Sequence, residues 1–315
     1  MIIGAMHTPP LPEGALRLTD WALIRAQGAD AASFLHGQLT QDITSLGEHQ
    51  ARLAGYCSAK GRLLASLVVC RRGPEELLLA CSADLLAPTL KRLSMFVLRA
   101  KCKLSDAGAE LSSYGLAGAS AAAWLGEAAP LNVWGAARRG EASVIRLPDA
   151  LGQTRYLLIQ ASAATPPELA ALSAEAWAWL EVRSGVPRIS AATVEQFVPQ
   201  MVNLELVSGV NFQKGCYPGQ EVVARSQYRG TLKRRAMLFD SDAPLHAGLE
   251  VFHSADPAQP AGMVVNAAAR PGGGWTALVE VKLSSLDGGS LHAGPTDAPA
   301  LRPLVLPYAM PAEAA

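Results

Sequence analysis

Two continuous apolar runs in the first third of the chain predict neighbouring buried strands. Residues 63–70 and 77–81 are almost entirely apolar, and Gly73-Pro74 lies between them. Apolar runs of this length, bounded by a glycine and proline turn, are typical of strands joined as a hairpin. We therefore expect both strands in the core of one sheet.

The next segment alternates between apolar and basic side chains. Within residues 97–104, Arg99, Lys101 and Lys103 occupy one set of alternate positions, and apolar residues occupy the other set. Successive side chains of a strand point to opposite faces. This pattern therefore predicts a half-exposed strand with one basic face.

Three segments carry the signals of helices. Asp30 precedes residues 31–36 as a candidate N-cap, because its carboxylate can accept a hydrogen bond from the first turn, and Gly37 follows them. Residues 117–127 and 166–183 are rich in alanine, with leucine and tryptophan at helical intervals. A glycine and a proline just beyond the last segment predict the end of its helix.

Strands are predicted in the remaining ordered parts. Residues 131–159, between the two alanine-rich segments, indicate short strands. After Arg235, apolar pieces alternate with proline and glycine turns, as in small antiparallel barrels. These pieces are residues 236–239, 250–252, 261–265 and 275–281.

The elements divide the chain into an arm, a large region and a β domain. Residues 1–15 are rich in proline and predict a loose N-terminal arm, whereas residues 240–315 are expected to form a C-terminal β-barrel with a tail. Residues 16–239 form either one domain or two subdomains, approximately 16–105 with 172–239, and 106–171. The predicted fold class is α+β, with antiparallel sheets and packed helices.

Composition indicates a large core and no overall electrostatic bias. Half of the 315 residues are hydrophobic, and 27 basic side chains balance 27 acidic ones. No whole-protein field therefore attracts nucleic acid or an anionic membrane. No apolar run approaches the ~20 residues that span a bilayer, and the first residues lack the basic stretch of a secretion signal. We expect a cytoplasmic protein without a membrane partner.

The cysteines and histidines indicate neither disulfides nor a resident metal. The five cysteines contain no C-x-x-C pair, and the six histidines show no metal-ligand spacing. We interpret the cysteines as reduced thiols and predict no tightly bound metal.

The densest group of chemically reactive residues is the stretch KGCYPGQE at residues 214–221. Its two glycines permit a positive φ and close backbone approach to a ligand, and its proline fixes φ. Cys216 lies two residues from Lys214, a cation that can favour the thiolate. Glu221 and Arg225, at positions i and i+4, predict an ion pair on a helix. The alternative is a glycine turn before a short helix, with an ordinary buried cysteine.

This stretch and several others resemble the YgfZ family. The resembling segments are LTDWA at 18–22, FLHGQ at 34–38, KGR at 60–62, FVPQ at 197–200, NL at 203–204, KGCYPGQEVVAR at 214–225, YRG at 228–230 and KR at 233–234. The resemblance runs from about residue 18 to the tail at residue 308, although beyond residue 240 the strand pattern alone carries it. Pro218 departs from the family pattern, which more often has a β-branched residue there. Members of the family are folate-binding, tRNA-modifying and iron–sulfur-assembly proteins, related in fold to the aminomethyltransferase (T-protein) of the glycine cleavage system.

The resemblance implies a folate pocket. Glu221 matches the carboxylate that receives the pterin in T-protein relatives, and Trp21 and Trp177 match tryptophans implicated in folate binding in YgfZ relatives. One acid between apolar or aromatic walls suits the amino-amide edge of a pterin. Core packing is the alternative for the tryptophans. The further cofactor-binding candidates are Gln200, Asn203, Tyr217 and Arg225, with Gln38, Thr40 and Asp42 ranked lower. The expected cofactor is tetrahydrofolate or a derivative, with or without a polyglutamate tail.

Two basic clusters contain no acidic residue. The first is Lys91, Arg92, Arg99, Lys101 and Lys103, and the second is Arg225, Arg229, Lys233, Arg234 and Arg235. Each is either a solvated face, a contact for tRNA phosphates, or a binding site for the carboxylates of a folate tail. We favour the folate tail for the second cluster.

The resemblance implies an accessory factor that supports assembly or repair of iron–sulfur enzymes, including a radical enzyme that methylthiolates tRNA. Direct tRNA contact is not required for that role. Cys216, assisted by Lys214, is the expected functional thiol. One cysteine cannot hold a four-thiolate cluster alone, so we expect it to lend one ligand in a transient complex or to undergo reversible oxidation.

Three alternatives have specific requirements. Aminomethyl transfer to tetrahydrofolate needs the T-protein aspartate, but Cys81 stands where that family has an asparagine, Asp84 comes too early, and Pro88 falls near the expected aspartate. A nucleophilic cysteine enzyme needs a general base near Cys216, and no histidine lies near it in sequence. An interaction scaffold with a vestigial pocket would bind no folate.

Overall fold

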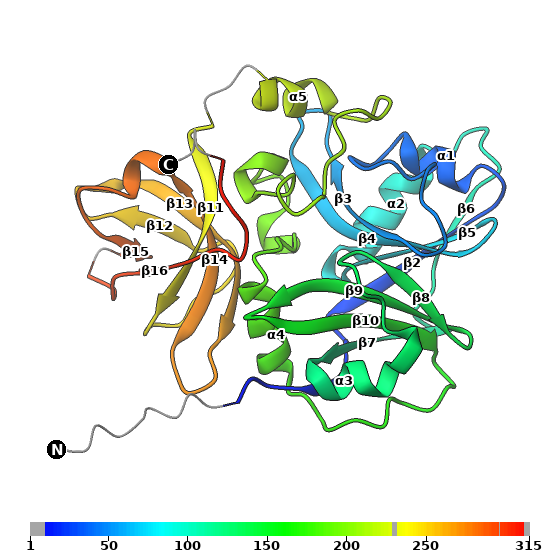
Figure 1. The fold of residues 1–315 in the computed structure, drawn as a ribbon. Helices are drawn as coiled ribbons and strands as arrows, with labels where there is room; N and C mark the ends of the chain where they lie inside the picture. The colour runs from blue at the N-terminus through cyan, green and yellow to red at the C-terminus, as the bar shows by residue number, and fades with distance from the viewer. Residues whose placement is uncertain (1–9, 229–231, 296, 312–315) are drawn as a thin grey trace.

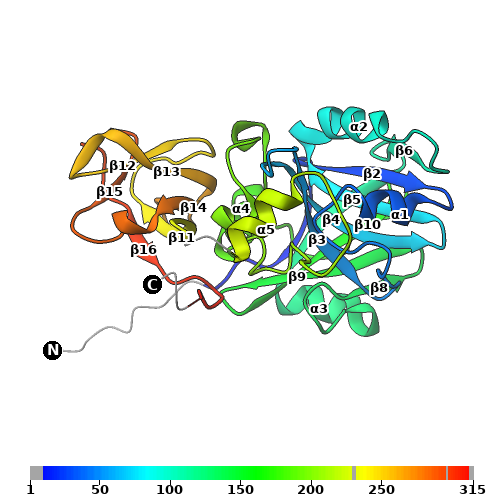
Figure 2. The same cartoon turned by 90° about the horizontal axis from the view of Figure 1, so that it is seen from above.

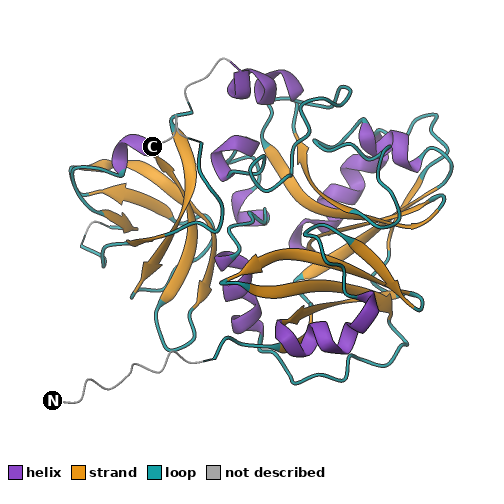
Figure 3. Ribbon diagram, in the orientation of Figure 1, coloured by secondary structure: helices purple, strands orange, loops and turns teal. Residues whose placement is uncertain are grey.

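Three antiparallel sheets form the framework of this protein. The computed structural model describes residues 10–228, 232–295 and 297–311, and the described part contains these sheets and a few short helices. Two of the sheets lie together on one side of α4 (Ala174–Arg183), and the third lies on its other side (Figures 1 and 3). The predicted α+β class with antiparallel sheets is confirmed.

The first sheet contains the two strands predicted from the apolar runs. Its order is β3-β4-β5-β2-β6, with bounds β2 (Trp21–Gln27), β3 (Ala51–Cys57), β4 (Leu63–Gly73), β5 (Glu76–Ser82) and β6 (Lys103–Asp106). β4 and β5 pair in antiparallel orientation with Val68 opposite Ala80, so the predicted hairpin is confirmed. The helical elements of this region are α1 (Ala31–His36), a 3-10 turn η1 (Ala83–Leu85) and α2 (Leu86–Met95).

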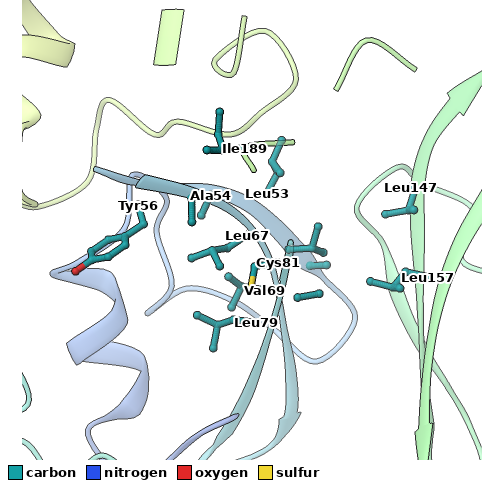
Figure 4. Close-up of a cluster of buried hydrophobic side chains, with 14 of the residues drawn as sticks. Leu53, Ala54, Tyr56, Leu67, Val69, Leu79, Cys81, Leu147, Leu157 and Ile189 are labelled. Carbon is teal, nitrogen blue, oxygen red and sulfur yellow. The ribbon is translucent and has the colours of Figure 1, made fainter. Parts of the chain in front are cut away.

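The second sheet packs against the first. Its order is β1-β7-β10-β9-β8, with bounds β1 (Gly14–Arg17), β7 (Leu111–Ala117), β8 (Ala136–Arg139), β9 (Ala142–Ala150) and β10 (Gln153–Ala161). α3 (Gly118–Leu125) and the 3-10 turn η2 (Gly126–Ala128) follow β7, as the alanine-rich segment predicts. Figure 4 shows the shared core, in which Leu67 and Leu79 of the first sheet lie near Leu147 and Leu157 of the second.

The third sheet curls into a half-barrel. Its order is β15-β12-β13-β14-β11-β16, with bounds β11 (Arg234–Ser241), β12 (Glu250–His253), β13 (Asp256–Ala269), β14 (Trp275–Lys282), β15 (Leu291–Ala293) and β16 (Arg302–Leu304). A 3-10 turn η5 (Leu283–Ser285) follows β14. The four predicted strand segments all fall in this sheet. β11 spans residue 240, where we place the domain boundary, and that boundary stays a prediction.

The predicted helix over residues 166–183 is wrong in its first half. α4 begins at Ala174, where the Ser173 hydroxyl accepts a hydrogen bond from the Ala176 amide at 3.1 Å. Before it, Ala171 bridges to Ala15 of β1, and the Leu172 amide donates to the carbonyl of Ala15 at 2.9 Å. Pro166 and Pro167 also lack the amide hydrogens that an α-helix needs. The segment is therefore extended because its backbone pairs with β1.

Asp30 is involved in two further predictions that are wrong, its own role as an N-cap and the strand over residues 97–104. It precedes α1, as predicted, but its carboxylate caps no helix amide; it accepts a hydrogen bond from the backbone amide of Lys101 at 2.7 Å. The Asp30 amide donates to the Lys101 carbonyl at 3.1 Å. The backbone of Lys101 is therefore engaged outside the sheet. The strand predicted over residues 97–104 begins only at Lys103, and Leu98 is 85% exposed instead of buried.

α5 (Gln220–Tyr228) and the 3-10 turns η3 (Ala191–Thr193) and η4 (Pro199–Val202) complete the described elements. α5 directly follows the reactive stretch, as the sequence predicts, and lies at the top of the view in Figure 1. Within the described residues, no helix is both long and apolar enough to cross a membrane.

Candidate functional site

The reactive loop at residues 214–221 is attached to the end of α1 by Lys214. Its ammonium donates hydrogen bonds to the carbonyls of His36 and Leu39, the second at 2.7 Å, and lies 4.8 Å from the centre of the Tyr217 ring. Burial lowers the pKa of Lys214 to about 8, although the charges of Asp42 and Cys216 act in the opposite direction. Lys214 is thus a cation fixed at the base of the loop.

Cys216 is the exposed cysteine of the chain. Cys57, Cys70 and Cys81 are buried, and burial raises the pKa of each thiol to about 12. Cys102 is half-buried, and burial raises its pKa as well. Because reaction requires access and the thiolate form, Cys216 is the sulfur best placed to react. The alternative of an ordinary buried cysteine is wrong for this position.

Glycine is required where the loop passes the turn between β3 and β4. Gly219 has a φ of +79°, and a Cβ there would lie 2.4 Å from the Ser58 carbonyl oxygen and 2.6 Å from the Cα of Gly61. Gly61 itself has a φ of +71°. Both the positive φ and the close backbone contact exclude a larger residue, so these glycines fix the shape of the loop.

A histidine, His36, lies beside the loop, and the sequence gave no sign of this proximity. A Cβ placed on Gly215 would lie 3.4 Å from Nε2 of His36, while Nδ1 of His36 lies 2.9 Å from Oδ1 of Asp42. Burial alone would raise the pKa of Asp42, but hydrogen bonds from Ser45, Thr44 and His36 hold it well below its usual value. The loop therefore faces an imidazole that an ionised carboxylate orients. His36 precedes the loop by more than a hundred positions, so sequence spacing gave no signal for it.

A separate cavity of about 170 Å³ lies where the three sheets and α4 meet. Trp21 of β2, Arg155 of β10 and Glu181 of α4 line it, together with Arg188 and, from the half-barrel, Asn266. The described residues that line the cavity include none from the loop at 214–221. The candidate residues thus belong to two places, the reactive loop and the cavity.

The cavity contains the carboxylate of Glu181, whose side chain is 16% exposed, near the guanidinium groups of Arg188 and Arg155. Nη2 of Arg188 lies 2.6 Å from Oδ2 of Asp20 and 3.6 Å from Oε2 of Glu181, and its guanidinium lies 5.3 Å from the centre of the Trp21 ring. Burial raises the pKa of Glu181, although Arg188 and Arg155 oppose the shift. Burial also lowers the pKa of Arg155 to about 10. Such a carboxylate would be stabilised by a ligand that donates hydrogen bonds to it.

Two donors on residues that line this cavity, Nη1 of Arg155 and Nε1 of Trp21, make no hydrogen bond of good geometry among the described residues. Arg155 is 3% exposed, and its Nη1 is buried without a hydrogen-bond partner among the described residues. Its guanidinium lies 5.1 Å from the centre of the Trp177 ring. Buried donors are usually paired, so Arg155 offers a hydrogen bond to a ligand in the cavity. Together, Trp21, Glu181 and Arg155 suit a flat heteroaromatic molecule that carries both donors and acceptors.

The predicted tryptophans differ in role. Trp21 lines the cavity, whereas Trp177 is 1% exposed and is not among the described lining residues. A Cβ on Gly115 would lie 2.6 Å from the Trp177 ring. Trp177 therefore packs tightly against β7, and its ring lies against the guanidinium of Arg155. This is the core-packing role, the alternative to folate binding that the sequence left open for this residue.

Most of the other predicted binding residues serve the framework. Gln200 and Asn203 are fully buried: the Gln200 amide donates to the Val223 carbonyl at 2.8 Å, and that of Asn203 to the Ala236 carbonyl at 2.7 Å. They join η4 to α5 and β11. Tyr217 is buried, and burial raises its pKa. We expect these three side chains to hold the loop in place.

Glu221 and Arg225 are exposed on α5 and lie outside the cavity lining. The predicted ion pair between these two described residues does not form, because water screens exposed charges and the pairing gains little. The carboxylate that lines the cavity with Trp21 is Glu181 instead. The sequence contains a signal for Glu181, since Trp177, Leu180, Glu181 and Ser184 share the i, i+3, i+4 and i+7 spacing of one helix face.

The two basic clusters also differ. In the second, Arg234 pairs with Glu280 and Arg235 with Glu205, and the latter two side chains are 3% and 6% exposed. Arg229 lies outside the described residues. Two of the guanidiniums proposed for a folate tail are therefore already neutralised. In the first cluster, Lys91, Arg99, Lys101 and Lys103 are exposed.

Asp84 does not occupy the cavity. Its Oδ2 accepts a hydrogen bond from the Ala191 amide at 2.9 Å, whereas Cys81 on the same segment does line the cavity. Among the residues that the structure describes, no group of three histidine, cysteine or acidic side chains is arranged to hold a metal ion.

Comparison with known proteins places the chain in a family. No protein-family model matches it. It is 39% identical over 256 residues to the tRNA-modifying protein YgfZ of Edwardsiella ictaluri, covering 73% of this chain and 71% of that protein. Identity to the tRNA-modifying protein YgfZ of Yersinia pseudotuberculosis is 32% over 250 residues, covering 73% and 74% of the two chains.

A solved structure shows the same fold. The aminomethyltransferase T of the glycine cleavage system from Bartonella henselae superposes with a TM-score of 0.66 at 16% identity, covering 95% of this chain and 87% of that one. This likeness confirms the predicted aminomethyltransferase-like fold. The sequence identity and its coverage show that the chain belongs to the YgfZ family.

Proposed function

We propose that this protein is a folate-binding accessory factor that supports the assembly or repair of iron–sulfur enzymes, including enzymes that modify tRNA, in the cytoplasm. The names of its relatives, which are tRNA-modifying proteins, and its T-protein-like fold support this class of role. The observation that carries the proposal is the cavity, which the half-buried Glu181 lines together with Trp21 and Arg155.

The cavity residues fit tetrahydrofolate or a derivative. In the proposed complex, the Glu181 carboxylate accepts hydrogen bonds from the amino-amide edge of the pterin, and Arg155 donates to a pterin acceptor. Trp21 forms a wall against the ring, while Arg188 holds both Trp21 and Glu181 in place. Each of these hydrogen bonds should contribute to the affinity for folate, because a carboxylate withdrawn from water without a hydrogen-bond partner raises the free energy of the protein.

We assign the thiol function to the separate loop. Cys216 is exposed, and Lys214 and the His36–Asp42 pair lie at its base. An exposed thiol can lend one ligand to a cluster in a partner enzyme or be oxidised reversibly. Aminomethyl transfer is not favoured, because Asp84 is held by a backbone amide outside the cavity. Direct contact with tRNA is not part of the proposal.

Calorimetric titration with tetrahydrofolate and 5-formyltetrahydrofolate tests the folate site. Wild type should bind, and Glu181→Gln should bind at least about tenfold more weakly, since a hydrogen bond to a charged group contributes about 1.5–3 kcal/mol. Glu221→Gln is the matched control and should bind as wild type. Equal affinity of Glu181→Gln and wild type would contradict the cavity assignment. Loss of binding in Glu221→Gln alone would restore the position that the family resemblance implies.

Complementation tests the thiol. Cells that lack their native YgfZ protein are supplied with wild type or Cys216→Ser, and methylthiolated tRNA is quantified by mass spectrometry. Cys216→Ser should fail to restore the modification while it still binds folate. Full restoration by Cys216→Ser would contradict the thiol function without affecting the folate proposal.

A further inference from the structure

The end of α2 and the loop after it gather exposed apolar side chains. Met95, Phe96 and Leu98 are 58%, 43% and 85% exposed. Large apolar side chains that cluster in water are typical of surfaces that a partner covers. Figure 2 shows α2 at the edge of the molecule, on the opposite side from the half-barrel. We call residues 91–103 the α2 surface.

The α2 surface carries only positive charge. Residues 91–103 contain five basic side chains and no acidic one. None of the five forms an ion pair with any residue that the structure describes. An apolar centre with unpaired cations around it is electrostatically complementary to an acidic partner.

A pocket of about 320 Å³ opens beside α2. Its apolar walls come from Leu64 of β4, from Leu85 and Pro88 at the start of the helix, and from Val194 after η3. Such walls fit an aliphatic side chain better than a charged group. Arg92 lines this pocket, and its guanidinium lies 5.8 Å from the centre of the Phe96 ring. The pocket and the exposed apolar cluster are therefore adjacent.

Two donors in the pocket lack acceptors. The Tyr56 hydroxyl and Nε of Arg92 are buried, and neither makes a hydrogen bond of good geometry among the described residues. Burial raises the pKa of Tyr56, and the neighbouring Arg92 guanidinium opposes that shift, so the two groups lie beside each other. Tyr56 as a whole is 1% exposed, and Figure 4 shows its hydroxyl turned away from the neighbouring cluster of apolar side chains. The lining also contains Asp84, whose Oδ2 already accepts the Ala191 amide. The two donors suit a carbonyl or carboxylate oxygen from a ligand.

We propose that the α2 surface is a docking site for an acidic segment of a partner protein, which inserts an aliphatic side chain into the pocket beside Tyr56 and Arg92. Acidic side chains of the segment meet Lys91, Arg99, Lys101 and Lys103, and a backbone carbonyl accepts the unpaired donors. RNA fits less well, because its phosphodiester chain has no aliphatic group for the pocket, and Met95 and Leu98 offer no flat ring for stacking a base. The site needs neither folate nor Cys216, so it goes beyond the proposed function.

Fluorescence anisotropy on the full chain tests this proposal. The probe is a fluorescein-labelled synthetic peptide with a central leucine between runs of glutamate. It should bind wild type with an affinity that falls as salt rises, and replacing its leucine by serine should weaken binding about tenfold. Leu98→Asp should also weaken binding about tenfold. Leu131→Asp is the matched control, because Leu131 is 91% exposed outside residues 91–103 and receives the same charge, and it should bind as wild type.

Several results of these titrations would overturn the docking proposal. No binding of the glutamate peptide, equal binding of a version with lysine in place of glutamate, or equal loss in Leu98→Asp and Leu131→Asp would each overturn the proposal. A labelled single-stranded oligoribonucleotide serves as the competing probe. If it displaces the peptide and binds more tightly, the surface belongs to nucleic acid and the proposal fails. Both leucines are exposed, so the variants should fold, and circular dichroism confirms this before titration.

Discussion

The Lys214 ammonium donates a hydrogen bond to the backbone carbonyl of Leu39 at 2.7 Å, across 175 positions of sequence. It also donates to the carbonyl of His36. Carbonyls at the end of a helix lack partners within the helix, and a cation there satisfies them and interacts favourably with the helix dipole. This contact places the cysteine loop against α1 and gives Lys214 a structural role.

Replacing Lys214 by methionine should lower the free energy of unfolding by about 1–2 kcal/mol, because carbonyls at the end of α1 lose their donor while water reaches part of the site. The cost should depend on pH. The folded-state pKa of about 8 is below the ordinary 10.5, so the folded protein binds the Lys214 proton more weakly than the unfolded chain does. Relative to Lys214→Met, the stability of wild type should therefore be highest above pH 10.5 and should decrease as the pH falls through 8. Urea denaturation of wild type and Lys214→Met on either side of pH 8 measures both effects. Lys60→Met, at an exposed lysine, is the control and should show no such dependence.

Iodoacetamide should label Cys216 before the other cysteines, because three of them are buried with pKa values raised to about 12. Intact-mass spectrometry of native protein should show one early adduct, and Cys216→Ser should lack it. Further adducts should appear only when denaturant exposes the core. Early modification of Cys81 in native protein would contradict the burial that the structure shows.

Substituting alanine for Gly219 should destabilise the loop by more than about 1 kcal/mol, since strain at positive φ adds to a backbone clash. Gly272→Ala separates the two causes: Gly272 has a φ of +88° but nothing within 4 Å of a Cβ. Gly272→Ala should therefore lower the free energy of unfolding by less than Gly219→Ala does. Thermal unfolding compares the variants. Equal costs would show that the contact of Gly219 with Ser58 and Gly61 is unimportant.

Arg235→Leu should cost about 3–5 kcal/mol, because Glu205 would remain buried without its partner. Both side chains are almost fully buried; Arg235 pairs with Oε1 of Glu205, and Oε2 has no hydrogen-bond partner in the described part of the chain. The double variant Arg235→Leu with Glu205→Leu should recover much of the loss. Denaturant midpoints measure this, with Arg302→Leu, which breaks an exposed ion pair to Asp242, as a control that should change little. A single variant as stable as wild type would contradict the prediction.

Glu181 should make folded-state stability fall as the pH rises. Burial raises its pKa above the ordinary 4.5, so its contribution is fully present below 4.5 and is lost as the pH increases through the folded-state pKa. Glu181→Gln carries no titrating group there. The unfolding free energy of wild type should therefore decrease relative to Glu181→Gln as the pH rises from 4.5, which denaturation at several pH values measures. A constant difference between the two proteins would show that Glu181 titrates normally.

The sequence revealed the chemistry of the loop but not its surroundings. Cys216 and Lys214 lie two residues apart in the chain, so their proximity follows from spacing alone. His36 and Asp42 come from the region of α1, and only folding brings them to the loop. The same limit explains Glu181: helical spacing places it on the apolar face of α4, but the helix pattern does not show that Trp21, Arg155 and Arg188 surround it.

The apolar pattern of the sequence predicted correctly those helices and strands whose structure depends mainly on local interactions. The strands β4 and β5, the helix α1 and the strands of the half-barrel follow from apolar periodicity and turn residues, because each buries a face that its own sequence defines. The pattern failed where distant backbone groups compete. Residues 97–104 alternate as a strand would, but the hydrogen bonds between Asp30 and Lys101 bend the segment away. Residues 170–172, within the segment predicted to be helical, pair with Ala15 of β1 instead of extending α4.

The sequence by itself determined the class of fold, the family resemblance and which cysteine is the candidate functional thiol, since composition, periodicity and short motifs encode these locally. Tertiary structure alone decided that Glu221 is exposed whereas Glu181 is half-buried in the cavity lining. It also decided that Arg234 and Arg235 pair with acidic residues, and that donors of Tyr56 and Arg92 lie without acceptors in a pocket. The physical reason is that burial and pairing of charges depend on which distant segments exclude water from a side chain, and spacing along one chain does not specify that.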